Sequence, residues 1–215
     1  GQEYDTSKLK YDVVRYPEEI TVASGITDTV FTETHGSDLL RYYYVVYSCN
    51  DTLRTKGVVS NAVVVGSPLY PPYGGVFTTI GDMYNYYTVL DENNDNYTWL
   101  YDTETGAAFY PYNWAQGAND WLISPPIRYD AGAPYQLVFS TFSTSSDYPE
   151  SMLVTLGKSK KPEGQTDVLL DLPTVPAQED DGSITTYTLD FTVPQTGVYY
   201  YGLKAYSKEY QDYLF

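Results

Sequence analysis

The sequence predicts an all-β protein. Apolar and polar residues alternate in most of the periodic runs, Gly, Pro, Asn and Asp separate these runs, and 26 of the 215 residues are tyrosine. Alternation with a period of two is typical of half-buried strands. Tyrosine suits such strands because its ring has an apolar face and a polar tip. We therefore expect short strands joined by turns throughout the chain.

The first third of the chain shows no helical period of 3.6 residues. Strands are expected at 9–16, 19–25, 29–34, 41–49 and 57–66. The run RYYYVVYSC (41–49) places Tyr42, Tyr44 and Val46 on one face, as a strand requires. Cys49 ends this run and is the one cysteine, so the chain cannot form an internal disulfide.

The stretch SPLYPPYGG (67–75) separates two parts of the chain, because three prolines and two glycines cannot continue a sheet ladder. We predict domains at 1–67 and 68–215. Strands are expected in the second part at 86–90, 96–102, 107–112, 120–124, 135–143, 151–157, 167–172, 184–193 and 197–207. Many short strands with turn signals between them predict a jelly-roll β-sandwich. One short helix is compatible with FTTIGDMYNY (77–86).

The charge of the chain excludes some classes of partner. Lys and Arg number 12 against 28 Asp and Glu, which gives a formal net charge of −16. A field of this sign repels phosphate backbones and anionic membranes, so we expect no nucleic acid as partner. The sequence holds no apolar run of about 18 residues, so we expect no membrane insertion in this segment. The same carboxylates are ligands that Ca²⁺ accepts.

The stretch LDENNDNYTW (90–99) has two interpretations. Asp91, Asn93 and Asp95 stand at alternate positions, the spacing of the first ligands of a calcium loop, and Asn96 stands where such a loop carries Gly. Asn tolerates the left-handed backbone that this position requires. The alternative is a polar turn in which Asp and Asn cap their own backbone. The sequence leaves both interpretations open. Ca²⁺ is the one cofactor that it suggests.

A second candidate site is the loop YPYNWAQGAND (110–120). Tyr110, Tyr112 and Trp114 alternate along it, with the amide of Asn113 between them. Flat apolar rings beside amide groups can stack on a sugar and hydrogen-bond its hydroxyls. We therefore predict ligand binding at Tyr110, Tyr112, Asn113 and Trp114. The alternative is a loop that packs on the edge of the sandwich.

No catalytic residues are predicted. His35 is the one histidine, and Ser37 and Asp38 lie too close to it in sequence to build an oriented triad. One histidine and one cysteine cannot complete a zinc site. A glycosidase would need two facing carboxylates in a pocket, and the sequence singles out no such pair. We expect a protein that is not an enzyme.

Residues 8–66 resemble the later part of a fibronectin type III domain. The strand YYYVVYSCN is similar to the pattern Tyr-x-Tyr-x-Val-x-Ala-x-Asn, with Tyr42, Tyr44, Val46 and Asn50 in place and Ser48 for Ala. SNAVVVG (60–66) resembles the closing strand. The opening strands, with their usual core tryptophan, have no counterpart here. We expect the chain to begin part-way through this domain, as a partial sandwich.

Residues 68–215 resemble the choice-of-anchor J domain, a relative of the cleaved adhesin modules. YYTVLDENNDNYTW is similar to the pattern Trp-Thr-x-x-Asp-x-Asn-x-Asp-Gly-x-x-Trp, with Tyr87 for the first Trp and Asn96 for Gly. The further motifs follow in order: NDWLISPPI (119–127), YPESMLVTLG (148–157), FTVPQTGVYYYGLKAYS (191–207) and YLF (213–215). The usual closing Asp-Asn-Ile after YLF is missing, and we expect a cut end there.

The resemblance implies a non-catalytic adhesion module of a bacterial surface protein, extracellular or attached to the cell surface. Its partners would be glycans or host and cell-surface proteins, bound through aromatic loops. The alternative function is a purely structural spacer within a larger surface protein or secreted hydrolase.

Overall fold

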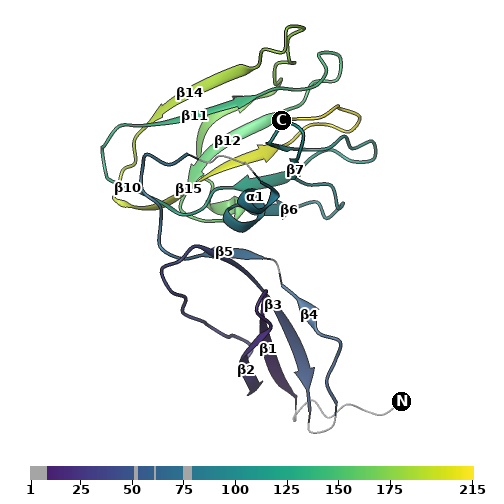
Figure 1. Cartoon of the computed structure of the whole chain (residues 1–215), viewed down its shortest axis with the longest axis vertical. Helices are drawn as coiled ribbons and strands as arrows, with labels where there is room; N and C mark the ends of the chain where they lie inside the picture. Colours follow the sequence, from purple (N-terminus) through teal and green to yellow (C-terminus); the bar gives the residue numbers. More distant parts are fainter. Residues whose placement is uncertain (1–8, 51–52, 61, 75–78) are drawn as a thin grey trace. The chain divides into compact units, whose positions relative to one another are not determined.

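The computed structural model describes residues 9–50, 53–60, 62–74 and 79–215. It divides into two compact units, Gly1–Ser67 and Pro68–Phe215 (Figure 1). Every strand pair is antiparallel, and the all-β prediction is confirmed. No helix among the described residues has the length and apolar character that a membrane crossing requires. Residue 61 and residues 77–78, which belong to two predicted elements, lie outside the described part.

The first unit is a single five-stranded sheet. Its strands follow the order β2-β1-β3-β4, and β5 also pairs with β3. Their bounds are β1 Lys10–Tyr16, β2 Ile20–Ile26, β3 Leu40–Cys49, β4 Val58–Val59 and β5 Val63–Val65. The core residues of this unit are Val13, Val14, Tyr42, Val45 and Val64.

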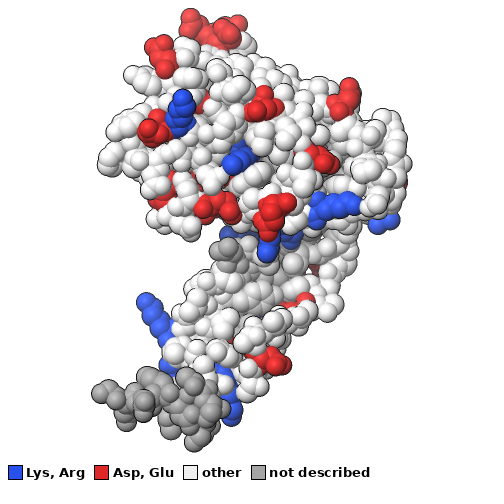
Figure 2. Space-filling view, turned by 180° about the vertical axis from the view of Figure 1, so that it is seen from behind, with Lys and Arg blue, Asp and Glu red and all other residues white. Residues whose placement is uncertain are grey.

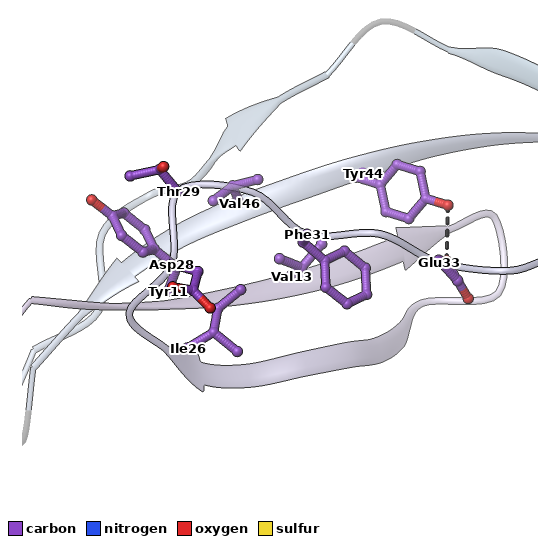
Figure 3. Close-up of a pocket in the computed structure, with 9 residues that line it drawn as sticks. All are labelled: Tyr11, Val13, Ile26, Asp28, Thr29, Phe31, Glu33, Tyr44 and Val46. Carbon is purple, nitrogen blue, oxygen red and sulfur yellow. Dashed lines mark hydrogen bonds between the residues drawn. The ribbon is translucent and has the colours of Figure 1, made fainter.

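Two predictions in the first unit are wrong. Residues 29–34 alternate like a strand but form none. They cross one face of the sheet, and the Phe31 ring lies near Val13 (Figure 3). The predicted strand 57–66 is divided into β4 and β5, which pair with different parts of β3. Alternation fixes which side chains share a face, but it does not fix whether a neighbouring strand is present to pair with.

The second unit is a two-layer β-sandwich with one helix. Its main sheet has six strands in the order β13-β12-β15-β9-β6, and β10 also pairs with β15. The strands are β6 Thr88–Asp91, β9 Asp120–Ile123, β10 Ile127–Tyr129, β12 Met152–Gly157, β13 Asp167–Leu172 and β15 Gly197–Ala205. The second layer contains two separate pairs, β11 Tyr135–Thr141 with β14 Thr185–Phe191, and β7 Leu100–Asp102 with β8 Ala107–Phe109.

The core of the second unit lies between these layers. Leu122 of β9 and Val154 of β12 are fully buried there, and Phe139 of β11 packs against the same cluster. Strand β11 alternates between half-buried and exposed residues along most of its length, as expected of a strand with one face on a core. Figure 1 shows β11 and β14 as a layer of their own beside β12 and β15.

Helix α1, Ile80–Tyr86, precedes β6. Thr79 and Asp82 form a capping box, in which each side chain bonds the other residue's backbone N–H. This pairing satisfies two of the free donors at the helix start. Met83 faces the core and is fully buried. A short 3₁₀ helix, Pro162–Gly164, precedes β13.

Candidate functional site

The loop after β8 is fastened to the C-terminal segment of the chain. Tyr110 and Leu214 exchange two backbone hydrogen bonds of 2.8 and 3.2 Å. Further along the loop, the N–H of Ala118 donates to the carbonyl of Ser207 over 2.8 Å. Gly117 permits this approach, because a Cβ atom there would lie 2.8 Å from that same carbonyl oxygen. The loop is therefore held in place at both of its ends.

This loop presents two aromatic side chains to solvent. Trp114 is 58% exposed and Tyr112 is 38% exposed. Tyr210 adds a third ring, which is 56% exposed. It lies at this loop because its N–H donates to the carbonyl of Asn113 over 3.0 Å. Tyr210 was not predicted from the sequence. Its signal there is a ring between two polar residues, Glu209 and Gln211.

Two residues of the predicted binding set, Tyr110 and Asn113, are buried in the structure. Tyr110 is 2% exposed and packs edge-on against Trp99, with ring centroids 6.2 Å apart. The Asn113 amide donates to Asp95, and its oxygen accepts from the N–H groups of Ala115 and Gln116. Both side chains are buried rather than exposed to solvent. Alternation along a loop does not determine which side chains reach solvent, because no sheet fixes their directions.

The backbone at Tyr210 is in the left-handed region, with φ of 63°. This region costs a side chain with a Cβ about 1–2 kcal/mol, so a ring is rarely found there. The hydrogen bond to Asn113 helps to keep the residue in this conformation. Strain of this kind, maintained by the surrounding structure, is found most often at functional sites.

The polar loop at 91–96 forms a network of turn hydrogen bonds. The two Asp91 carboxylate oxygens accept from the N–H groups of Asp95 and Asn96. The Asp95 carboxylate accepts from the N–H of Tyr97 and from the amide of Asn93. Asn96 adopts a φ of 65°, the conformation expected where Gly would otherwise stand. These are the bonds of a turn in which Asp and Asn cap the backbone.

The carboxylate and amide oxygens of the same loop are groups that Ca²⁺ accepts as ligands. Among the described residues, no three His, Cys, Asp or Glu side chains are arranged to hold a metal ion. The carboxylate oxygens of Asp91 and Asp95 accept hydrogen bonds from backbone N–H groups of the loop. Two buried oxygens, Asn93 Oδ1 and Asp120 Oδ1, make no hydrogen bond. The loop thus has the hydrogen bonds of a turn, and Ca²⁺ at Asp91, Asn93 and Asp95 stays a prediction.

Two carboxyl groups are buried in the second unit. Burial raises the pKa of Asp120 to about 6, and the carboxylates of Asp91 and Asp95 add to the shift. Asp91 lies directly opposite Asp120 across β6 and β9. Burial also raises the pKa of Glu150 to about 7, although the Ser207 hydroxyl donates a hydrogen bond to this carboxyl group.

Two cavities lined by described residues, one in each unit, differ in chemistry. In the first unit, a groove of about 520 Å³ lies between the sheet and residues 28–33, where Ile26, Val13 and Val46 meet Phe31 (Figure 3). In the second unit, a cavity of about 640 Å³ lies between the layers and is lined by tyrosine and apolar side chains together with Gln136, Ser140 and Thr141. None of the described residues that line this second cavity is an Asp, Glu or His.

His35 makes structural contacts in the first unit. Its ring stacks on Tyr42 with centroids 4.7 Å apart, and its Nε2 lies 3.0 Å from the Tyr44 hydroxyl. Tyr44 in turn donates to Glu33, which also binds Arg15. In this cluster the imidazole is part of the packing on β3.

Known proteins are only weakly similar to this chain. No family model matches the sequence, and no curated protein is similar to it. The K2 cleaved adhesin domain of Lys-gingipain has a TM-score of 0.48 at 16% identity, over 65% of this chain and 92% of that one. The K1 domain of Lys-gingipain from Porphyromonas gingivalis W83 has a TM-score of 0.47 at 12% identity, over 60% and 85%.

A carbohydrate-binding module of Cellvibrio mixtus lichenase 5A, solved in complex with cellotriose, has a TM-score of 0.36 at 16% identity. It covers 59% of this chain and 90% of its own.

Proposed function

We propose that the second unit is a non-catalytic binding module of an extracellular, adhesin-type surface protein, and that it holds a glycan at Tyr112, Trp114 and Tyr210. The observation that carries the proposal is the exposure of Trp114 on a loop fastened at both ends. An exposed indole loses the free energy that burial would provide, roughly 2–3 kcal/mol for a large apolar side chain. A ligand that covers the ring recovers part of this free energy.

The chemistry of this site suits a sugar. The C–H face of a pyranose can stack on an aromatic ring, and the exposed amide of Gln116 lies two residues from Trp114 to bond hydroxyl groups. The loop is already ordered by its bonds to the C-terminal segment, so little conformational entropy is lost on binding. The acidic surface adds selectivity for neutral over anionic glycans, since acidic side chains are spread over the face of the second unit seen in Figure 2.

The test is a glycan array followed by calorimetry with the glycans that bind. Trp114→Ala should weaken binding about tenfold or more, equivalent to about 1.4 kcal/mol. Tyr210→Asn should also weaken it, and Asn tolerates the left-handed backbone, so the turn is kept. Tyr70→Ala is the matched control, because it removes an exposed ring from a different segment and should leave binding unchanged.

The outcomes separate this proposal from its alternative. Binding that survives Trp114→Ala at full strength places the ligand elsewhere. No binding to any glycan favours the structural spacer. Calcium at Asp91, Asn93 and Asp95 stays a prediction, tested by melting with and without millimolar Ca²⁺, because a ligand of the native state raises its melting temperature. An unchanged melt would contradict it.

A further inference from the structure

The loop that carries Trp114 is held in its middle by contacts with other segments of the chain. We call residues 110–118 the aromatic loop. Residues 111–117 lie between the two anchors at Tyr110 and Ala118, and none of them belongs to a strand. A segment without a strand neighbour is mobile unless side chains hold its backbone. The side-chain bonds within this segment therefore determine where Trp114 is presented.

Asn113 holds the backbone on both sides of Trp114. Its side chain is buried, and its Oδ1 accepts from the N–H groups of Ala115 and Gln116 over 2.9 and 3.1 Å. An amide has one oxygen and one NH₂ group, so these two donors fix which way the amide faces. The NH₂ group must then face Asp95, to which Nδ2 donates over 2.7 Å. Asn113 is in place only while Asp95 accepts this bond.

The Asp95 carboxylate uses both of its oxygens. Oδ2 accepts from the amides of Asn113 and Asn93, over 2.7 and 3.0 Å. Oδ1 accepts from the N–H of Tyr97 over 2.8 Å. Hydrogen bonds to a charged acceptor are stronger than those between neutral groups. Asp95 therefore joins the polar turn at 91–96 to the aromatic loop at a point just before Trp114.

The same turn contacts the aromatic loop and its continuation after Trp114. The Asn93 amide, besides its bond to Asp95, donates to the carbonyl of Gly117 over 2.9 Å. The N–H of Glu92 donates to the carbonyl of Asn119 over 3.2 Å. The polar turn thus supports the chain on both sides of the exposed ring.

Tyr210 depends on the same carboxylate through Asn113. Its N–H donates to the carbonyl of Asn113, and its backbone has a φ of 63°. A residue with a Cβ leaves this conformation readily once its bonds are lost, because the left-handed region is unfavourable. A displaced Asn113 would therefore release Tyr210 as well as Trp114.

We propose that Asp95 is the positioning residue of the aromatic site, which fixes Trp114 and Tyr210 through Asn113 in the arrangement that binds a glycan. This role rests on the function proposed above. Asp95 acts through Asn113 and does not itself touch the sugar. The task requires no cation, because the partners of the carboxylate are N–H groups of the chain itself.

The decisive variant is Asp95→Asn, which keeps the size of the side chain. An amide at position 95 has one acceptor oxygen, so it can accept from Tyr97 or from Asn113 but not from both. Its NH₂ group would face another donor in either orientation. All samples contain EDTA, so that a bound cation plays no part in the result.

The first measurement is amide hydrogen exchange by NMR without any glycan. In Asp95→Asn, the N–H groups of Ala115, Gln116 and Tyr210 should exchange about tenfold faster or more, because the bonds that protect them depend on Asn113. The N–H of Val154, within the main sheet, should keep its rate. A loss of global stability would accelerate exchange at Val154 too.

A reciprocal exchange of the two side chains tests the pairing itself. Asp95→Asn combined with Asn113→Asp lets the amide at position 95 donate to the carboxylate at position 113. The second oxygen of that carboxylate can still accept from Ala115 and Gln116. Protection of these two N–H groups should return to within about threefold of the parent. Asn113→Asp alone sets two carboxylates opposite each other and should lose the protection.

The second measurement repeats the glycan array and its binding titrations with the same variants. Asp95→Asn should weaken every glycan that the parent binds by about tenfold or more, and the reciprocal pair should restore binding. Asp181→Asn is the matched control, because it removes the same charge from a carboxylate that accepts from the N–H of Ser183 in another turn. This control should leave both binding and exchange unchanged.

The outcomes distinguish this proposal from the function on which it rests. Unchanged exchange at Ala115, Gln116 and Tyr210 in Asp95→Asn would overturn the positioning role. Protection that the reciprocal pair does not restore would show that Asp95 acts through a partner other than Asn113. Faster exchange with full glycan binding would remove Asp95 from the binding mechanism. A parent that binds no glycan would overturn the proposed function, while the exchange rates would still show whether Asp95 holds the loop.

Discussion

The two units of the chain share the alternating pattern of apolar and polar residues, but they cover their apolar residues to different extents. In the first unit, one sheet carries the apolar residues and a crossing segment covers part of it, with Phe31 over Val13. In the second unit, a six-stranded sheet and a second layer enclose side chains such as Leu122 and Val154 completely. Alternation supplies an apolar face, but a dry core requires another layer to cover that face.

The largest expected difference between the units is the response to loss of a core ring. Trp99→Ala should lower the free energy of unfolding of the second unit by about 3–5 kcal/mol, because it leaves a cavity between two layers. Val13→Ala in the first unit should cost only about 1–2 kcal/mol. Urea unfolding of both variants, followed for each unit, measures the difference. Equal losses would show that the first unit is as tightly enclosed as the second.

The pH dependence of stability should have opposite signs in the two units. The Glu150 pKa is raised from 4.5 to about 7, so the native state keeps its proton while the unfolded chain loses it. This stabilisation is complete below pH 4.5 and is lost as the pH rises through 7, a change of roughly 3 kcal/mol. Asp120, with a pKa of about 6, adds to the same decline.

In the first unit, the N–H of Gly25 and the hydroxyl of Ser24 hold the pKa of Asp12 below its usual value of 3.8. This group stabilises the native state above pH 3.8, and its contribution is lost as the pH falls below that value. Denaturant titrations between pH 3 and 8 measure both trends. Glu150→Gln should flatten the decline in the stability of the second unit between pH 4.5 and 7. An unaltered decline in this variant would show that other groups cause it.

A smaller difference is expected for two tyrosine hydroxyls. Tyr87→Phe leaves the Tyr201 hydroxyl without its partner inside the sandwich, which should cost about 1–3 kcal/mol. Tyr44→Phe in the first unit should cost less, because Glu33 keeps its bond with Arg15. Thermal melts of the two variants measure both losses of stability. A larger loss for Tyr44→Phe would place the better-enclosed hydrogen bond in the first unit.

The smallest effect on stability is expected at the proposed glycan site. Trp114→Ala should change the free energy of unfolding by no more than about 0.5 kcal/mol, because the indole is mostly exposed. Phe31→Ala should cost more, since its ring packs over the sheet of the first unit. Melting of each variant without ligand is the measurement. A large loss for Trp114→Ala would mean that this ring supports the fold rather than a ligand.

Several elements could be predicted from the sequence because local patterns decide them. Strands β11 and β14 follow clear alternating runs, and each has one face on the core. Residues 29–34 alternate equally well yet form no strand, because pairing depends on a neighbour that no local pattern supplies. For the candidate site, the sequence identified Trp114 and Tyr112 but also included Tyr110 and Asn113, which are buried. It missed Tyr210, which reaches the site through a bond to a residue almost one hundred positions earlier.

The sequence by itself determined the all-β class, the acidic surface and the position of the aromatic loop, since composition and period-two alternation are local properties. Only the tertiary structure decided which rings of that loop remain exposed, because the C-terminal segment covers Tyr110 and leaves Trp114 free. The structure also decided that the carboxylates of the 91–96 loop take backbone N–H groups as partners. It also places Asp91 opposite Asp120, because β6 and β9 pair only in the folded sandwich.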